Sequence, residues 1–344
     1  MVRPARSLWT LPLTLTLVAG CAQPRGETFP QVTSTVGFPV RLAGGLTGPL
    51  EIASPPRRIL PGNAAFVDFV AAILGPDRVV AVPRAADAYS PSLASDPAWK
   101  ALPRFEGFDG ELILALEPDL VLAHPWQTPE MLAGVRTRGI PVLVLPLPTS
   151  WADVLATLEL LGHVSGEEER AQVFLAELQA RRERLRRSSG ASRGLRALSY
   201  TNLGTGGSVA GRGTTADILF ELAGMENAAG EAGLEGHADL DLEGLLALDP
   251  DLIVVGDRDS PETNAPSASF LLENEGLRDL RAVRDHRILS LPAALFSSAS
   301  FELLGAAERL VIELELAEGL VPLPGERFSS PRRAAAPGSP PGGS

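Results

Sequence analysis

Cysteine, histidine and long apolar segments are scarce in this sequence. It has one cysteine and four histidines among its 344 residues. A single cysteine excludes disulfide bonds within the chain and zinc sites built from cysteines. The formal net charge of −12 repels phosphate backbones, which argues against nucleic-acid binding. Hydrophobic residues nevertheless make up 45% of the chain, so we expect a folded protein of about two domains.

The first apolar run has the length of an export signal. Arg3 and Arg6 precede this run at 8–18, and small residues then lead directly to Cys21. The order resembles a bacterial lipobox, in which cleavage leaves a lipidated cysteine at the N-terminus. An ordinary signal peptide with a chance cysteine is the alternative. Since no later apolar run is long enough to span a membrane, we predict an exported lipoprotein on the periplasmic or extracellular face, anchored by lipid at Cys21.

Composition divides the chain into six parts. Residues 22–56 are rich in Pro, Gly and Thr, and residues 325–344 consist mostly of Pro, Gly, Ser, Ala and Arg. Such segments are typical of tethers and tails. We predict a signal peptide at 1–20, a lipid-anchored tether with short strands at 21–56, an N-terminal lobe at 57–163, a bridging helix at 164–190, a C-terminal lobe at 191–322 and a disordered tail at 323–344.

Between these ends, short apolar runs alternate with helical patterns. The runs predict buried strands at 58–60, 79–82, 120–123, 142–145, 195–200, 252–255 and 288–291. Asn63 is placed to cap a helix, and Ser150 and Ser165 each begin a capping-box pattern. The glycine-rich segment 204–213 is expected to form a flexible loop. The alternation predicts an α/β fold with two lobes, in which helices flank parallel-type central sheets.

One segment occurs twice. Residues 109–123 align with residues 241–255 without a gap, and eight of the fifteen positions are identical. Each copy contains an aspartate-capped short helix, a Pro-Asp turn and a buried strand. The repeat predicts two lobes of like architecture. Between them, residues 167–187 contain no helix breaker, with acids at the start and arginines at the end, as the helix dipole favours. At 1.5 Å per residue this predicts one rod of roughly 30 Å and a stiff connection between the lobes.

Several segments together resemble one family of proteins. They are Arg57 to Leu60 with the following Pro-Gly-Asn-Ala turn, the segment 75–82, both copies of the repeat, and the segment 218–227. In this order and spacing the chain is similar to the substrate-binding proteins of ABC importers for iron–siderophore, haem or cobalamin. The resemblance covers residues 57–315. It implies two α/β lobes bridged by one long helix, with the ligand held in the cleft between them.

The resemblance and the fold class together point to candidate ligand contacts. In open α/β sheets ligands bind beyond the carboxyl ends of the strands, and the family's cobalamin binder carries aromatic residues at several of these positions. The ligand-binding candidates are Asn63, Arg84, Phe105, His124, Trp126, Tyr200, Asn202, Arg212, His237 and Phe296. The family's basic residue near the final helix is replaced here by Glu302, which weighs against a carboxylate siderophore.

The resemblance also implies a partner. Glu111 and Glu243 occupy equivalent positions in the repeat, where family members contact arginines of a dimeric ABC permease, which works with its ATPase. We expect no cofactor and no resident metal, and no enzyme motif is present, so no catalytic residue is assigned. The expected function is capture of a metal chelate and its delivery to the permease. The alternatives are a zinc- or manganese-binding lipoprotein and an interaction lipoprotein without a transport role.

Overall fold

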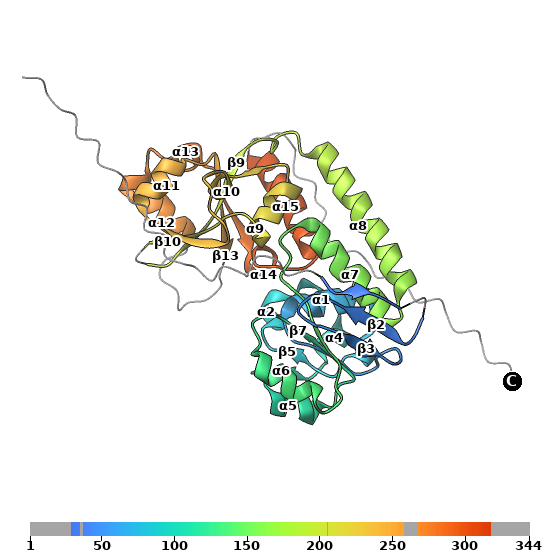
Figure 1. Cartoon of the computed structure of the whole chain (residues 1–344). Helices are drawn as coiled ribbons and strands as arrows, with labels where there is room; N and C mark the ends of the chain where they lie inside the picture. The colour runs from blue at the N-terminus through green and yellow to red at the C-terminus, as the bar shows by residue number, and fades with distance from the viewer. Residues whose placement is uncertain (1–28, 35–36, 205, 258–266, 318–344) are drawn as a thin grey trace, which may run out of the picture.

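The computed structural model describes residues 29–34, 37–204, 206–257 and 267–317. Figure 1 shows two lobes, with the helix α8 (Glu168–Ser188) running along the outside from one to the other. The predicted signal peptide, the lipidated Cys21 and the disordered tail at 323–344 lie outside the described residues. Within the described ranges no helix is both long enough and apolar enough to cross a bilayer.

A small antiparallel sheet precedes the first lobe. Its strands, in the order β1-β2-β3, are β1 (Gln31–Val32), β2 (Val40–Ala43) and β3 (Leu50–Ile52). Val40, Leu42 and Ile52 are buried in the core that they share with the first lobe. The Thr47 hydroxyl lies 2.9 Å from both the backbone N–H and the carbonyl oxygen of Val144. The segment predicted as a tether with short strands therefore contains a part that packs on the lobe.

The N-terminal lobe contains a parallel sheet in the order β4-β7-β8. Alternate residues of its strands point to opposite faces, so Leu120 and Leu122 enter one core and Val121 and Ala123 enter another. The strands are β4 (Ile59–Pro61), β7 (Leu120–Ala123) and β8 (Val142–Val144), with β5 (Val82–Pro83) paired to β6 (Arg104–Phe105) beside them. The helices are α1 (Ala64–Ile73), η1 (Pro76–Arg78), α2 (Ala86–Tyr89), α3 (Pro91–Ser95), α4 (Pro97–Lys100), α5 (Gly110–Leu116), α6 (Pro129–Arg136) and α7 (Trp151–Ser165).

The C-terminal lobe contains one sheet in the order β12-β10-β9-β13-β14, with β11 paired to β9. Strands β9, β11, β13 and β14 are parallel, and β10 and β12 add an antiparallel edge. The strands are β9 (Arg196–Asn202), β10 (Gly207–Ala210), β11 (Glu226–Asn227), β12 (His237–Leu240), β13 (Leu252–Asp257) and β14 (Ile288–Pro292). The helices are α9 (Thr215–Leu222), α10 (Ala228–Glu231), α11 (Leu242–Leu248), α12 (Ser267–Glu273), η2 (Glu275–Leu277), α13 (Arg281–Arg284), α14 (Ala293–Phe296) and α15 (Glu302–Ala317).

The long bridging helix predicted from the sequence is confirmed as α8, which has 21 residues. Its buried residues Leu175, Leu178 and Leu185 belong to one continuous core that contains residues of both lobes, including Phe69 of α1 and Leu304 of α15. The helix is therefore packed against both lobes along its length, in keeping with the stiff connection expected from its length.

Two local predictions were wrong. Ser165 does not begin a capping box, because it ends α7 and is followed by Gly166 in the left-handed region at φ 74°. The helix α8 begins after Glu167 without a side-chain cap. The segment 204–213 is not a loop throughout, since residues 207–210 form the strand β10. Val209 and Ala210 are buried there, and Gly207 leaves room for the Tyr200 ring, whose Cε2 would lie 2.1 Å from a Cβ at that position.

Candidate functional site

Half of the predicted ligand contacts lie at or just after the carboxyl ends of the strands. Asn63 follows β4, Arg84 follows β5, His124 follows β7, Asn202 ends β9 and Phe296 lies in the short helix after β14. In an α/β protein this is the edge of the sheet where ligands bind. The two lobes each contribute to the set, as the sequence predicted from chain order alone.

His124 and Trp126 form the most distinctive pair at this edge. Their ring centroids are 4.5 Å apart. The ring of Phe66, on α1, lies 6.4 Å from the ring of His124. His124 is 3% exposed, whereas Trp126 is 75% exposed. Neither ring nitrogen of His124 has a hydrogen-bond partner, and burial lowers the pKa of the imidazole to about 4. The imidazole is therefore neutral at pH 7, and it lies next to a large apolar ring in solvent.

Phe105 and Tyr200, two other predicted contacts, are largely buried. Phe105 is 6% exposed and packs 6.0 Å from Phe108 in the core beneath the first sheet. Tyr200 is 1% exposed, and its ring stacks on Phe270 at an interplanar angle of 11°. Both side chains present little surface to a ligand in this conformation, so their predicted role remains a prediction.

The two predicted arginines have carboxylate neighbours. The Arg84 guanidinium forms an exposed ion pair with Glu106 at 2.5 Å. Arg212 is exposed, and Glu231, which is bonded to Arg196, is a carboxylate whose lowered pKa arises mainly from that bond and only in small part from the charge of Arg212. Of the two arginines, Arg84 therefore has its charge offset by an ion pair.

Arg212 and His237 lie together at the far end of the β10–β12 pair. Ala210 is paired with His237, while Gly207, at the opposite end of β10, is paired with Asn202. His237 is exposed on the edge strand. The turn after Arg212 approaches the N-terminal lobe, since a Cβ at Gly213 would lie 3.9 Å from Thr149.

The remaining predicted contacts have structural roles as well. The Asn63 side chain accepts a hydrogen bond from the Phe66 backbone N–H at 2.8 Å and caps α1. The Asn202 side chain accepts one from the Gly204 N–H at 2.9 Å. The ring of Phe296 lies over the backbone of β13, where a Cβ at Gly256 would be 2.7 Å from its Cδ1.

Sequence reasoning missed several apolar side chains near these residues. Phe66 was assigned only to the apolar face of a helix, although it lies beside His124. Phe108 lies over Gly62, directly before the cap of α1. Leu203, which follows β9, is 57% exposed. Leu203 could have been found from its position directly after β9, whereas the proximity of Phe108 to Gly62 is visible only in the fold.

The repeat places Glu111 and Glu243 on equivalent helices. Asp109 caps α5 by accepting from the Leu112 N–H, and Asp241 caps α11 by accepting from the Gly244 N–H. Each glutamate lies in the first turn and is exposed. Neither side chain forms a hydrogen bond or an ion pair with another described residue. Since the aspartates provide the caps, the glutamates are available to a partner.

Both helices are fastened to their sheets by the same kind of arginine clamp. In the first copy Arg58 donates to the carbonyl oxygens of Leu116 and Glu117, each at 2.7 Å. The Asp119 carboxylate accepts from the Arg58 backbone N–H at 2.8 Å. Glu117 has a φ of 46°, so the clamp stabilises a left-handed residue at the helix end.

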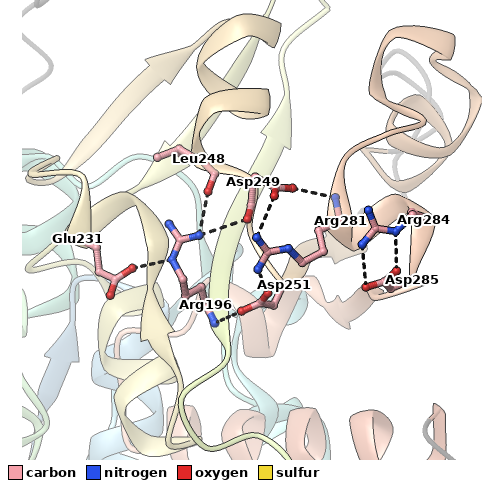
Figure 2. A network of polar contacts seen from close by, with 8 residues as sticks. All are labelled: Arg196, Glu231, Leu248, Asp249, Asp251, Arg281, Arg284 and Asp285. Atoms are coloured by element: carbon pink, nitrogen blue, oxygen red, sulfur yellow. Dashed lines mark hydrogen bonds and ion pairs between the residues drawn. The ribbon is translucent and has the colours of Figure 1, made fainter.

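In the second copy Arg196 takes the place of Arg58. It donates to the carbonyl oxygens of Leu248 and Asp249 at 3.0 and 3.2 Å, as Figure 2 shows. Asp251 accepts from the Arg196 backbone N–H, and Arg281 forms ion pairs with both aspartates of this turn. The two copies of the repeat therefore share the same arginine and aspartate contacts as well as similar sequences.

An open surface pocket lies beside Glu111. It is formed by α5 and α6, and its lining includes Leu114, Met131, Glu130 and Arg138. The exposed leucines Leu242 and Leu246 lie on α11 of the other lobe.

Within the described part of the chain, no group of three or more His, Cys, Asp or Glu side chains is placed to hold a metal ion.

Comparison with known proteins places this architecture. The chain is 22% identical over 332 residues to YvrC of Bacillus subtilis, an uncharacterized ABC transporter substrate-binding lipoprotein, covering 92% of this chain and 96% of that one. It is 25% identical over 248 residues to a cobalamin-binding protein of Halobacterium salinarum, covering 72% and 66%. The apo structure of RhuT, a periplasmic heme-binding protein of Roseiflexus sp. RS-1, superposes with a TM-score of 0.65 at 26% identity, covering 76% and 98%. Residues 63–295 match the sequence profile of the periplasmic binding proteins, so the chain belongs to this family.

Proposed function

We propose that the protein captures a metal chelate of the haem, siderophore or cobalamin class between its two lobes and delivers it to an ABC permease. The family and the relatives named above are binding proteins, which supports transport without catalysis. The observation that carries the ligand class is the pair of His124 and Trp126 at the carboxyl end of β7. Three-quarters of the Trp126 side chain is in solvent, and so large an exposed aromatic ring is typical of a binding surface.

The electrostatics of this edge narrow the choice of chelate. Arg84 is paired with Glu106, and Glu302 stands at the helix start where the resemblance to siderophore binders would lead us to expect an arginine, which weighs against a carboxylate siderophore. A planar or nearly neutral chelate would gain apolar contact with the exposed ring of Trp126. His124 would offer a neutral imidazole to it once Trp126 moves aside. On charge alone a corrinoid with amide side chains fits this surface better than a carboxylate chelate, whereas haem, which carries two propionates, would be held by its flat apolar ring.

Delivery would use the matched glutamates. Glu111 and Glu243 are exposed, uninvolved in the fold and held on clamped helices of like geometry, one per lobe. Such a pair suits a permease dimer with a positive residue on each half. The lipid anchor at Cys21 would keep the protein at the membrane that carries the permease and its ATPase.

Tryptophan fluorescence tests the ligand class. The chain has four tryptophans, of which Trp99 and Trp151 are buried and Trp126 is exposed. The full chain is titrated separately with haemin, cyanocobalamin, a ferric hydroxamate, zinc and manganese. Saturable quenching by one chelate, with an affinity that is lowered in Trp126→Ala and unchanged in Val173→Ala on the outer helix, supports the proposal. Saturable binding of zinc or manganese, without binding of any chelate, would support the metal-ion alternative and overturn the proposed chelate class.

A further inference from the structure

The lobes are joined at a second place besides α8. The first turn of α15, from the C-terminal lobe, packs against α1 and α3 of the N-terminal lobe. The ring of Phe301 lies 5.9 Å from Phe69 of α1 and 4.9 Å from Phe174 of α8, edge-on to both. Near them, α14 packs against α2. This contact lies where the two lobes meet, and α14 and α2 come together there in Figure 1.

A buried carboxyl group spans this junction. Asp68 of α1 is 0% exposed. It accepts hydrogen bonds from the Ser90 hydroxyl of its own lobe at 2.5 Å and from the Ser300 hydroxyl of the other lobe at 2.9 Å. Ser300 is itself 0% exposed and is bonded to the Ser298 hydroxyl at 2.9 Å. The polar contact between the lobes is therefore closed off from water.

The charged groups around Asp68 are mostly acidic. Glu302, on the first turn of α15, accepts from the Ser92 hydroxyl at 3.1 Å and forms a second polar bridge between the lobes. Arg181 of α8 is bonded to Glu308 at 2.7 and 3.1 Å and is the nearest basic group to Glu302. No basic side chain among the described residues forms an ion pair with Asp68. Burial, helped by the charge of Glu302, raises the pKa of Asp68 to about 7, and it outweighs the hydrogen bonds from Ser90, Ser300 and the Ser92 backbone N–H, which lower the pKa.

The junction is continuous with the proposed ligand edge. Asp68 lies on the same helix as Phe66, which contacts His124, and that helix is capped by Asn63. Ser300 follows α14, which carries Phe296. A change in the angle at this junction therefore moves both sides of the proposed ligand site.

We propose that Asp68 and Ser300 form a proton-controlled latch between the two lobes, held while Asp68 carries a proton and weakened when it ionises. The physical reason is that an ionised carboxyl group without a cation is costly to bury. Opening the junction lets water reach Asp68 and returns it to the ordinary titration range of an aspartate. The latch is therefore strongest in acid and weakens as the pH rises through 7. Its effect on ligand capture rests on the proposed function, whereas the latch itself does not.

Amide hydrogen exchange of the ligand-free full chain tests this. Exchange of peptides that cover residues 89–94 and 298–305 is measured from pH 4 to 8.5 and divided by the intrinsic rate at each pH. The opening constant of the junction should rise by up to about tenfold per pH unit between pH 4 and 7 and then level off. In Asp68→Asn the slope should be clearly smaller than in the wild type, and only the dependence contributed by Glu302, whose pKa burial also raises, should remain. Asp279→Asn, on an exposed site of the C-terminal lobe, is the matched control and should follow the wild type.

A second variant keeps the test decisive if Asp68→Asn does not fold. Glu302→Gln removes the neighbouring negative charge, so the level-off point should move to lower pH. A flat wild-type profile, or a slope in Asp68→Asn as steep as that of the wild type, would overturn the latch. Because the measurement uses no ligand, a positive result stands even if no chelate binds, and the two proposals fail separately.

Discussion

The rings of His124 and Trp126 lie 4.5 Å apart, yet one is buried and the other is almost fully in solvent. Trp126 covers a histidine whose two nitrogens have no partner. Buried polar groups are normally hydrogen-bonded, and exceptions concentrate at functional sites. In this arrangement Trp126 covers the imidazole of His124, and a ligand could reach that imidazole when the Trp126 side chain moves.

Replacing Trp126 by Ala should weaken binding of the preferred chelate several-fold or more, because an aromatic pair contributes about 0.5–1.5 kcal/mol beyond the area it buries. Trp126→Phe should retain most of the affinity. Equilibrium titration with each chelate measures this. Unchanged affinity in Trp126→Ala would remove this residue from the site.

His124 should make the protein sensitive to acid. Its pKa is lowered to about 4 in the folded state, so between pH 4 and 6.5 the unfolded chain binds more protons. Stability from this residue is present above pH 6.5 and is lost as the pH falls towards 4, by roughly 2–3 kcal/mol in total. Urea denaturation of His124→Phe and wild type at pH 4.5 and 7.5 measures the difference. The variant should therefore lose less stability than the wild type between pH 7.5 and 4.5. An equal loss of stability in acid for both proteins would contradict the assignment.

Replacing both Glu111 and Glu243 by Ala should abolish uptake while ligand affinity and melting temperature stay nearly unchanged. The reason is that Asp109 and Asp241 cap the two helices without them. Transport of the chelate into cells measures the effect, with Glu169→Ala together with Glu273→Ala as the control for lost surface charge. Normal transport by the docking variant, or loss of ligand binding in solution, would rule out the docking role.

Replacing Arg58 by Met should destabilise the protein by about 1–2 kcal/mol, because two helix-end carbonyl groups lose their donor. Met keeps the apolar stem of the side chain. Arg57→Met is the matched control, since only the backbone of Arg57 contacts Asp119. Chemical denaturation of the three proteins gives the comparison, and equal stability of both variants would show that the clamp is dispensable.

Replacing Cys21 by Ser should release the protein from the membrane fraction, because the predicted anchor is a lipid attached to this residue. Fractionation of cells and immunodetection measure the distribution. A variant that stays with the membrane as the wild type does would show that the lipobox prediction is wrong.

The sequence predicted the elements whose signals are local. The strand at 120–123 has the predicted bounds, and α8 begins one residue later than predicted. Buried strands, aspartate caps and the absence of a helix breaker all depend on neighbours in the chain. The repeat was recognisable from the shared Asp-x-Glu start and the Leu-x-Pro-Asp-Leu pattern, and the structure adds that Glu117 and Asp249 are both left-handed.

Contacts between distant segments were not predictable. Asp68 interrupts an apolar helix face, and its partner Ser300 lies 232 positions away. Glu302 was noted only as a missing positive charge, although it bonds to Ser92 across the lobes. Phe105 matched a family position in loop spacing, yet its ring packs inward against Phe108. In each case the side chain's surroundings are set by tertiary packing and not by its own segment.

The core that runs through α8 has a consequence for how the molecule unfolds. One hydrophobic cluster contains the first sheet, the bridging helix and the helices α9 and α15 of the other lobe. Neither lobe can melt alone without exposing the apolar face that the other supplies through this helix. Although the two lobes are built on a repeated pattern, they share a single cooperative transition, and heat should separate them only by unfolding both.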